Sequence, residues 1–91
     1  MPGRPEIPID PGAPFADFAI GLRTLRSASN KTYKQMAVEV NYGISVLCTA
    51  ASGRILPSLG VTLAFVRACD GPVAEWVHLW ELARAGGRRH R

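Results

Sequence analysis

Apolar residues recur at a helical spacing along nearly the whole chain, and this pattern restricts the possible folds more than any other feature. Phe15, Phe18, Leu22 and Leu25 illustrate it, because their spacing places them on one face of a helix. No segment alternates apolar and polar residues cleanly enough to predict a strand. A chain of 91 residues, 47% of them apolar, is long enough for one domain with one small core. We therefore expect a single all-α domain.

Capping and turn residues divide this pattern into five helices, which we expect to pack as a bundle. Thr32 with Gln35 three residues later is a capping box, and Asn41 suits the left-handed turn that ends a short second helix. Gly53 ends the third helix, and Ser58 is an N-cap residue for the fourth. The expected helices span residues 15–27, 33–40, 44–52 and 59–69, with a fifth beginning near Pro72. The bundle would occupy residues 15–85, between a proline-rich N-terminal tail (residues 1–14) and a basic C-terminal tail (residues 86–91).

The expected core is built from the apolar face of each helix. Trp76 and Trp80 share one stripe of the fifth helix, so we expect both to be largely buried against the first and fourth helices. Cys48 and Cys69 lie in apolar helical runs without metal-ligand spacing, and we expect reduced, buried thiols. His78 lies off the tryptophan stripe and is expected at the surface. The other expected core residues of the second, third and fourth helices are Met36, Ala37, Val40, Leu47, Ala50, Leu59, Leu63 and Val66.

The net charge of +4 is distributed unevenly along the chain. Five cations between residues 23 and 54 accompany a single carboxylate, Glu39, whereas residues 55–85 are slightly acidic. Such a polarised surface suits a polyanion such as double-stranded DNA. Paired carboxylates, Ser/His/Asp or Cys/His arrangements and phosphate-binding loops are lacking, so the sequence predicts no enzyme, no metal site and no cofactor. Because the sequence has neither a membrane-length apolar run nor an export signal, we expect a cytoplasmic protein without a membrane-spanning segment.

Two adjoining segments carry a resemblance to a known family. The segment "LRTLRSASNKTYKQMAVEVNYGISVLCTAASGRILPS" resembles the helix-turn-helix of lambda-repressor-like regulators, the xenobiotic-response-element (XRE) type. The following "LPSLGVTLAFVRACDGPVAEWVHLWELARA" is similar to an actinobacterial subgroup with the pattern GR.LPS..VT.AFV.AC.G…W...W..AR. The resemblance covers about residues 15–85. It implies an all-α, cytoplasmic, DNA-binding fold, found in small regulators and as the front domain of larger signalling proteins.

The third helix departs from the family at the positions that read bases. The resemblance makes Ile44, Ser45 and Thr49 the candidates for base readout, where family members often carry Arg, Gln, Ser or Asp. A bidentate Arg–guanine or Gln–adenine pair contributes roughly 1–3 kcal/mol of discrimination, and no side chain of this helix can form one. Asn41 stands where the family usually has the turn glycine, and Gly43 where it usually has Ser or Thr. Base readout is therefore expected to be weak.

The residues expected to contact phosphate are better preserved. Lys31, Tyr33 and Lys34 lie at the start of the second helix, whose N-terminus can approach a phosphate. Arg54 follows the third helix, at a position where the family commonly contacts the DNA backbone. Contacts of this kind position a protein on DNA without specifying the base sequence.

Two functions stay open at this point. The first is a DNA-binding protein, a transcriptional regulator with weak or sequence-tolerant base readout. The alternative uses the helix-turn-helix fold as a protein–protein interaction or oligomerisation module, through an apolar strip of Ile44, Val46 and Cys48. Aliphatic side chains suit a protein surface better than base edges, which offer only thymine methyl groups. We therefore expect the third helix to contact a second copy or another protein, whether or not the domain also holds DNA.

Overall fold

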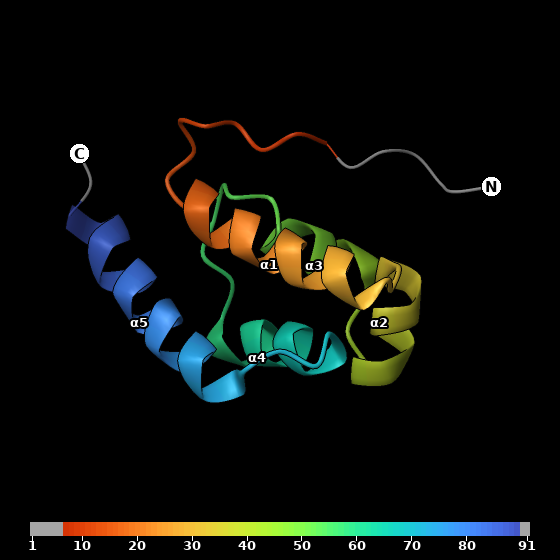
Figure 1. Ribbon diagram of the computed structural model, residues 1–91. Helices are drawn as coiled ribbons and strands as arrows, with labels where there is room; N and C mark the ends of the chain where they lie inside the picture. Colours follow the sequence, from red (N-terminus) through yellow and green to blue (C-terminus); the bar gives the residue numbers. More distant parts are fainter. Residues whose placement is uncertain (1–6, 90–91) are drawn as a thin grey trace.

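Five helices and no strand form in residues 7–89, the part of the chain that the computed structural model describes (Figure 1). Their bounds are α1 Ala16–Ser29, α2 Tyr33–Val40, α3 Ile44–Ala50, α4 Leu59–Ala68 and α5 Val73–Arg89. The prediction of an all-α fold with five helices is confirmed. The bounds of α2 agree with the prediction, while α1 ends two residues later than expected and α3 ends two residues earlier. No helix in the described part combines the length and the apolar character needed to cross a bilayer.

The capping residues predicted from the sequence are in place. The Gln35 backbone nitrogen donates to Thr32 Oγ1 at 3.1 Å, and the Thr32 nitrogen donates to Gln35 Oε1 at 2.8 Å, which completes the capping box. Ser58 Oγ accepts from the Val61 nitrogen at 3.1 Å and caps α4. Asn41 has a left-handed backbone with φ of 61° and ends α2. These side chains satisfy backbone groups that the helix ends would otherwise leave without partners.

The core lies around α4, which contacts all four other helices and lies in the lower middle of Figure 1, below α1. Because α4 has neighbours on several sides, its buried residues lie on more than one stripe. They are Thr62, Ala64, Phe65, Val66 and Ala68. Leu59 and Leu63, which were expected to be core residues, are only half-buried at the edge of α4. Met36, Leu47 and Ala50 are buried as predicted, and together with Leu22 they complete the contact of α1, α2 and α3 with α4.

Two further expectations about burial need correction. Trp76 is buried with its ring edge-to-face against Phe18 of α1, at 5.3 Å between ring centres, but Trp80 is only half-buried. The Trp80 indole lies at the edge of the bundle, where Nε1 donates to the Pro57 carbonyl at 2.8 Å. Cys69 is buried as predicted, whereas Cys48 is exposed. Cys48 follows the buried Leu47 on a helix, and a step of one residue turns its side chain well away from the core.

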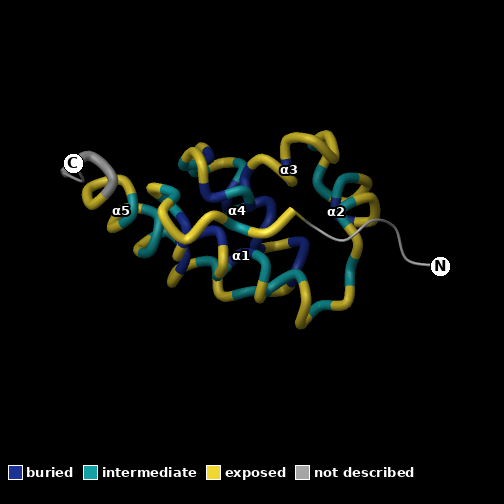
Figure 2. Tube along the Cα trace, turned by 90° about the horizontal axis from the view of Figure 1, so that it is seen from above, coloured by how far each residue is buried: buried dark blue, intermediate teal, exposed yellow. Residues whose placement is uncertain are grey.

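The two ends of the described chain differ from the expected tails. The Phe15 nitrogen donates to the Gly53 carbonyl at 2.9 Å, and Arg23 donates to the Ile7 carbonyl at 2.7 Å and to the Ala51 carbonyl at 2.8 Å. Residues 7–15 are thus held against α1 and the end of α3. Helix α5 continues to Arg89, beyond the expected boundary at residue 85, and its residues 84–86 are exposed (Figure 2). Residues 1–6 and 90–91 of the two expected tails lie outside the described residues.

Candidate nucleic-acid interface

Helices α2 and α3 and the three residues between them form a compact helix-turn-helix. The Asn41 nitrogen donates to the Ala37 carbonyl at 3.0 Å, and the left-handed conformation of Asn41 turns the chain sharply away from α2. Gly43 then takes an extended conformation, with φ of −68° and ψ of 154°, and precedes α3 as its N-cap residue. Two short helices joined in this way hold the second helix rigidly at an angle to the first.

Helix α3 is anchored by two residues and exposes the rest. Leu47 and Ala50 are 0% and 2% exposed and face the core. The residues between and before them point outward, and Figure 2 shows α3 as a largely exposed helix on the outside of the domain. The exposed residues of α3 are Ile44, Ser45, Val46, Cys48 and Thr49. All the candidates for base readout or protein contact therefore lie on the accessible face of this helix, as that role requires.

A shallow groove of about 290 Å³ runs between α3 and the start of α4. Ser45, Val46 and Thr49 form one wall, and Ile55 and Val61 belong to the other. Ile55 is 51% exposed, and the sequence interpretation did not single it out as a site residue. The available signal was an isoleucine in a short loop between Gly53 and Pro57, where a polar residue is more usual. The groove adds an apolar wall to the face that was expected to read bases.

Two cations lie exposed beside this helix-turn-helix. Lys34 is the second residue of α2, and Arg54 follows α3 in a loop where its backbone nitrogen donates to Ser52 Oγ at 3.2 Å. Tyr33, by contrast, has a half-buried ring, which meets Phe65 edge-to-face at 6.2 Å and lies 4.6 Å below the Arg26 guanidinium. Lys34 and Arg54 therefore carry the exposed positive charge of the expected phosphate contacts.

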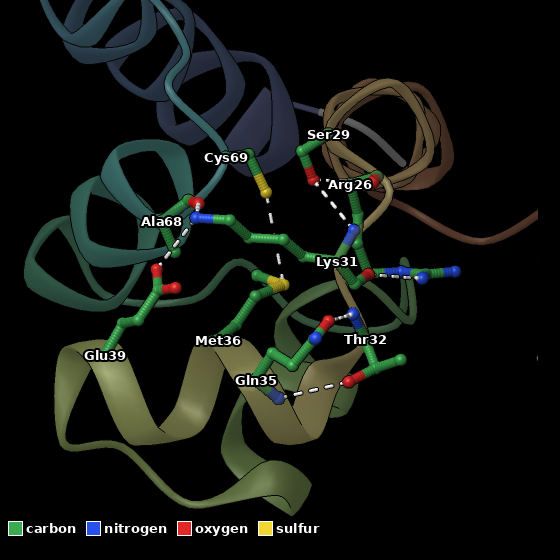
Figure 3. A network of polar contacts seen from close by, with 9 residues as sticks. All are labelled: Arg26, Ser29, Lys31, Thr32, Gln35, Met36, Glu39, Ala68 and Cys69. Atoms are coloured by element: carbon green, nitrogen blue, oxygen red, sulfur yellow. Dashed lines mark hydrogen bonds and ion pairs between the residues drawn. The ribbon is translucent and has the colours of Figure 1, made fainter.

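Lys31 has two hydrogen-bond partners within the domain. Its Nζ donates to Glu39 Oε1 at 2.9 Å and to the Ala68 carbonyl at 2.6 Å, so the side chain stretches from the α1–α2 turn to the end of α4 (Figure 3). The hydrogen bond to Glu39 raises the pKa of the Lys31 ammonium, which keeps its charge. A cation at the C-terminal end of a helix also interacts favourably with the helix dipole. The Lys31 ammonium therefore links α2 to α4, and its expected phosphate contact stays a prediction.

Cys69 lies beside this link. Its Sγ is 4.0 Å from Met36 Sδ, and the two sulfur atoms face each other in Figure 3. Burial raises the pKa of the Cys69 thiol, so the neutral form is favoured in the folded domain. Within residues 7–89, no group of three or more His, Cys, Asp or Glu side chains is placed to hold a metal ion.

Comparison with known proteins agrees with the geometry. A family model described as a helix-turn-helix domain matches residues 17–79, which include all of α1 but its first residue, α2 to α4 and the first part of α5. The match is consistent with the resemblance to XRE-type regulators. The chain matched no curated protein and no solved structure.

Proposed function

Because the chain belongs to the helix-turn-helix domain family, we propose that it is a DNA-binding protein that acts in transcriptional regulation in the cytoplasm. Domains of this family typically bind duplex DNA through the second helix of the motif and are not enzymes. Here that helix is α3, with its accessible face outward. We propose no catalytic role and no cofactor for the domain.

The observation that carries this proposal is the exposed face of α3 together with two exposed cations of the same motif. Lys34 is the second residue of α2, and Arg54 lies in the loop that follows α3. Both side chains can reach phosphates if α3 enters the major groove, and each phosphate contact releases counterions from the DNA. Tyr33, held by its half-buried ring, would support the same backbone contact from the start of α2.

The base readout would be weak. Ser45 and Thr49 are the exposed polar side chains of α3, and a hydroxyl can donate or accept a single hydrogen bond with any of several bases. Ile44 can make only apolar contacts. We therefore propose a protein whose affinity comes mainly from phosphates and whose preference among sequences is small.

The experiment is a salt titration of binding to several unrelated DNA duplexes, with the variants Lys34→Gln and Arg54→Gln. Each substitution should weaken binding to all duplexes alike and reduce the slope of log K against log salt by about one unit. Arg84→Gln is the matched control, because Arg84 is exposed and its substitution removes the same single positive charge from α5, outside the helix-turn-helix. A loss confined to one duplex, or an equal loss in Arg84→Gln, would contradict the assigned phosphate contacts.

A second candidate function is supported by the apolar residues of α3. Ile44 and Val46 are 46% and 40% exposed, and Cys48 beside them is exposed as well. Such side chains could be covered by a second copy or by another protein. The double variant Ile44→Asp, Val46→Ser leaves the anchors Leu47 and Ala50 in place. If it changes the oligomeric state seen by light scattering while DNA binding persists, protein contact is the function of this strip.

A further inference from the structure

The groove beside α3 has the composition of a site for small apolar groups. Val46 and Ile55 are 40% and 51% exposed on its two walls, and Ala50 and Pro57 are buried residues that line it. None of the described residues that line the groove is charged. A group that enters it meets mainly aliphatic carbon.

The polar atoms at its rim are few. Ser58 Oγ already accepts a hydrogen bond from the Val61 nitrogen at 3.1 Å, as the cap of α4. The hydroxyls of Ser45 and Thr49 remain as the side-chain polar groups of the α3 wall. On the major-groove edge of a base pair, the C5-methyl group of thymine is the apolar feature, and the other groups are hydrogen-bond donors and acceptors. Of the groups on a base edge, that methyl group matches the groove best.

The charges nearby favour DNA over a protein as the occupant. Arg54 is exposed and directly precedes Ile55 in the sequence, and Lys34 is exposed at the start of α2. An exposed cation next to a residue of an apolar groove complements a methyl group that stands close to a phosphate backbone. A few half-exposed aliphatic side chains also cover far less than the roughly 800 Å² per partner that a stable protein interface buries.

We infer that this groove receives the C5-methyl groups of pyrimidines, so that the domain prefers methylated pyrimidines, thymine or 5-methylcytosine, over unmethylated ones. The inference rests on the proposed DNA-binding function and adds a recognition chemistry to it. Val46 and Ile55 are the specificity-determining residues, and Ser45 and Thr49 only assist. Burial of one methyl group corresponds to about a four-fold preference in affinity.

Two pairs of duplexes test the inference by fluorescence anisotropy at one fixed salt concentration. The first pair is an alternating dA–dT duplex and the same duplex with deoxyuridine in place of thymidine. The second is an alternating dG–dC duplex with and without 5-methylcytosine. Within each pair the hydrogen-bonding groups are the same, and the main chemical difference is the methyl group in the major groove. The methylated member of each pair should bind more tightly, by about four-fold for each methyl group that is buried.

Single variants locate the effect in the groove. Val46→Ala and Ile55→Ala should reduce the methyl preference, measured as the ratio of the two affinities within each pair of duplexes, because each variant removes aliphatic surface from the groove. Leu82→Ala in α5 is the matched control, because Leu82 is 55% exposed, close to the 51% of Ile55. Circular dichroism would verify that each variant is folded.

The outcomes separate the inference from the proposed function. Equal binding to both members of each pair would overturn the methyl preference and leave DNA binding standing. A preference that survives in Val46→Ala and Ile55→Ala would place it elsewhere and overturn the groove assignment. Absence of binding to every duplex would overturn the proposed function and the inference with it. In that case, an oligomer that Ile55→Ala dissociates would identify the groove as a protein contact.

Discussion

Thr62→Val is expected to stabilise the domain, although it replaces a residue in the middle of the core. Thr62 lies in α4 and is 0% exposed, and its Oγ1 finds no hydrogen-bond partner among residues 7–89. A buried hydroxyl gives up its hydrogen bonds with water on folding, and without a replacement the loss is not recovered. Valine has nearly the same shape and a similar helix propensity, so the substitution removes this cost and changes little else.

The size of the effect follows from that cost. A buried polar group without a partner is unfavourable by about 1–3 kcal/mol, and the added methyl group gains further apolar burial. We therefore expect the free energy of unfolding to rise by about 1–2 kcal/mol. For a domain of this size, that corresponds to an increase in Tm of roughly 4–15 °C. Thermal melts followed by circular dichroism give the shift, and urea unfolding with an unchanged m value would show that the folded state is the one affected.

Two further threonine variants make this reasoning refutable. Thr62→Ser keeps the hydroxyl and loses the methyl group, so it should destabilise the domain by about 1 kcal/mol. Thr24→Val alters an exposed threonine whose Oγ1 donates to the Ile20 carbonyl at 2.9 Å, and it should leave Tm nearly unchanged. A lower Tm for Thr62→Val than for the parent would mean that the Thr62 hydroxyl is satisfied in solution, and the argument would fail.

Three other predictions concern packing and pH. Gly21→Ala should destabilise the domain by up to about 2 kcal/mol, measured by urea unfolding. A Cβ atom at residue 21 would lie 2.8 Å from the buried Trp76 ring, and the cost of this overpacking exceeds the gain in helix propensity. Trp80→Phe should cost about 1 kcal/mol in the same assay, mainly through loss of the Nε1 hydrogen bond to the Pro57 carbonyl. Because the pKa of Cys69 is raised in the folded state, its stabilising contribution is complete below the thiol pKa of the unfolded chain and is lost as pH rises through the folded value. Unfolding measured above about pH 9 should therefore show a steeper loss of stability for the parent than for Cys69→Ala.

The local features of the fold could be predicted from the sequence because each depends on a few neighbouring residues. The capping box at Thr32 and Gln35 and the left-handed turn at Asn41 are set by side chains that bond to backbone within a few positions. The outward face of α3 also followed directly, since a helix that buries Leu47 and Ala50 must expose the residues between them. These features gave the helix-turn-helix without any knowledge of the tertiary contacts.

The features that the sequence did not predict depend on contacts between distant segments. Lys31 bonds to the carbonyl of Ala68, 37 positions away, and no pattern near Lys31 indicates that acceptor. Trp80 shares a stripe with Trp76, but α5 runs along the edge of the bundle, so only Trp76 reaches the core. Ile55 belongs to the groove only because its loop folds beside α3. In each case, the missing information was the packing of the helices against one another.

The apolar chemistry of the α3 surface is not imposed by the fold. Ile44 and Val46 are about half-exposed, and the core would be the same if polar residues stood in their place. Gly43 likewise has open space around the position of a Cβ atom, so a Ser that caps α3, as Ser58 caps α4, would fit there. Since the stability of the fold does not require Ile44, Val46 or Gly43, packing does not explain why α3 lacks polar side chains that could read bases. The apolar partner of α3 explains it. That partner is the methyl groups of DNA if the groove binds pyrimidines, or an apolar protein surface in the alternative function.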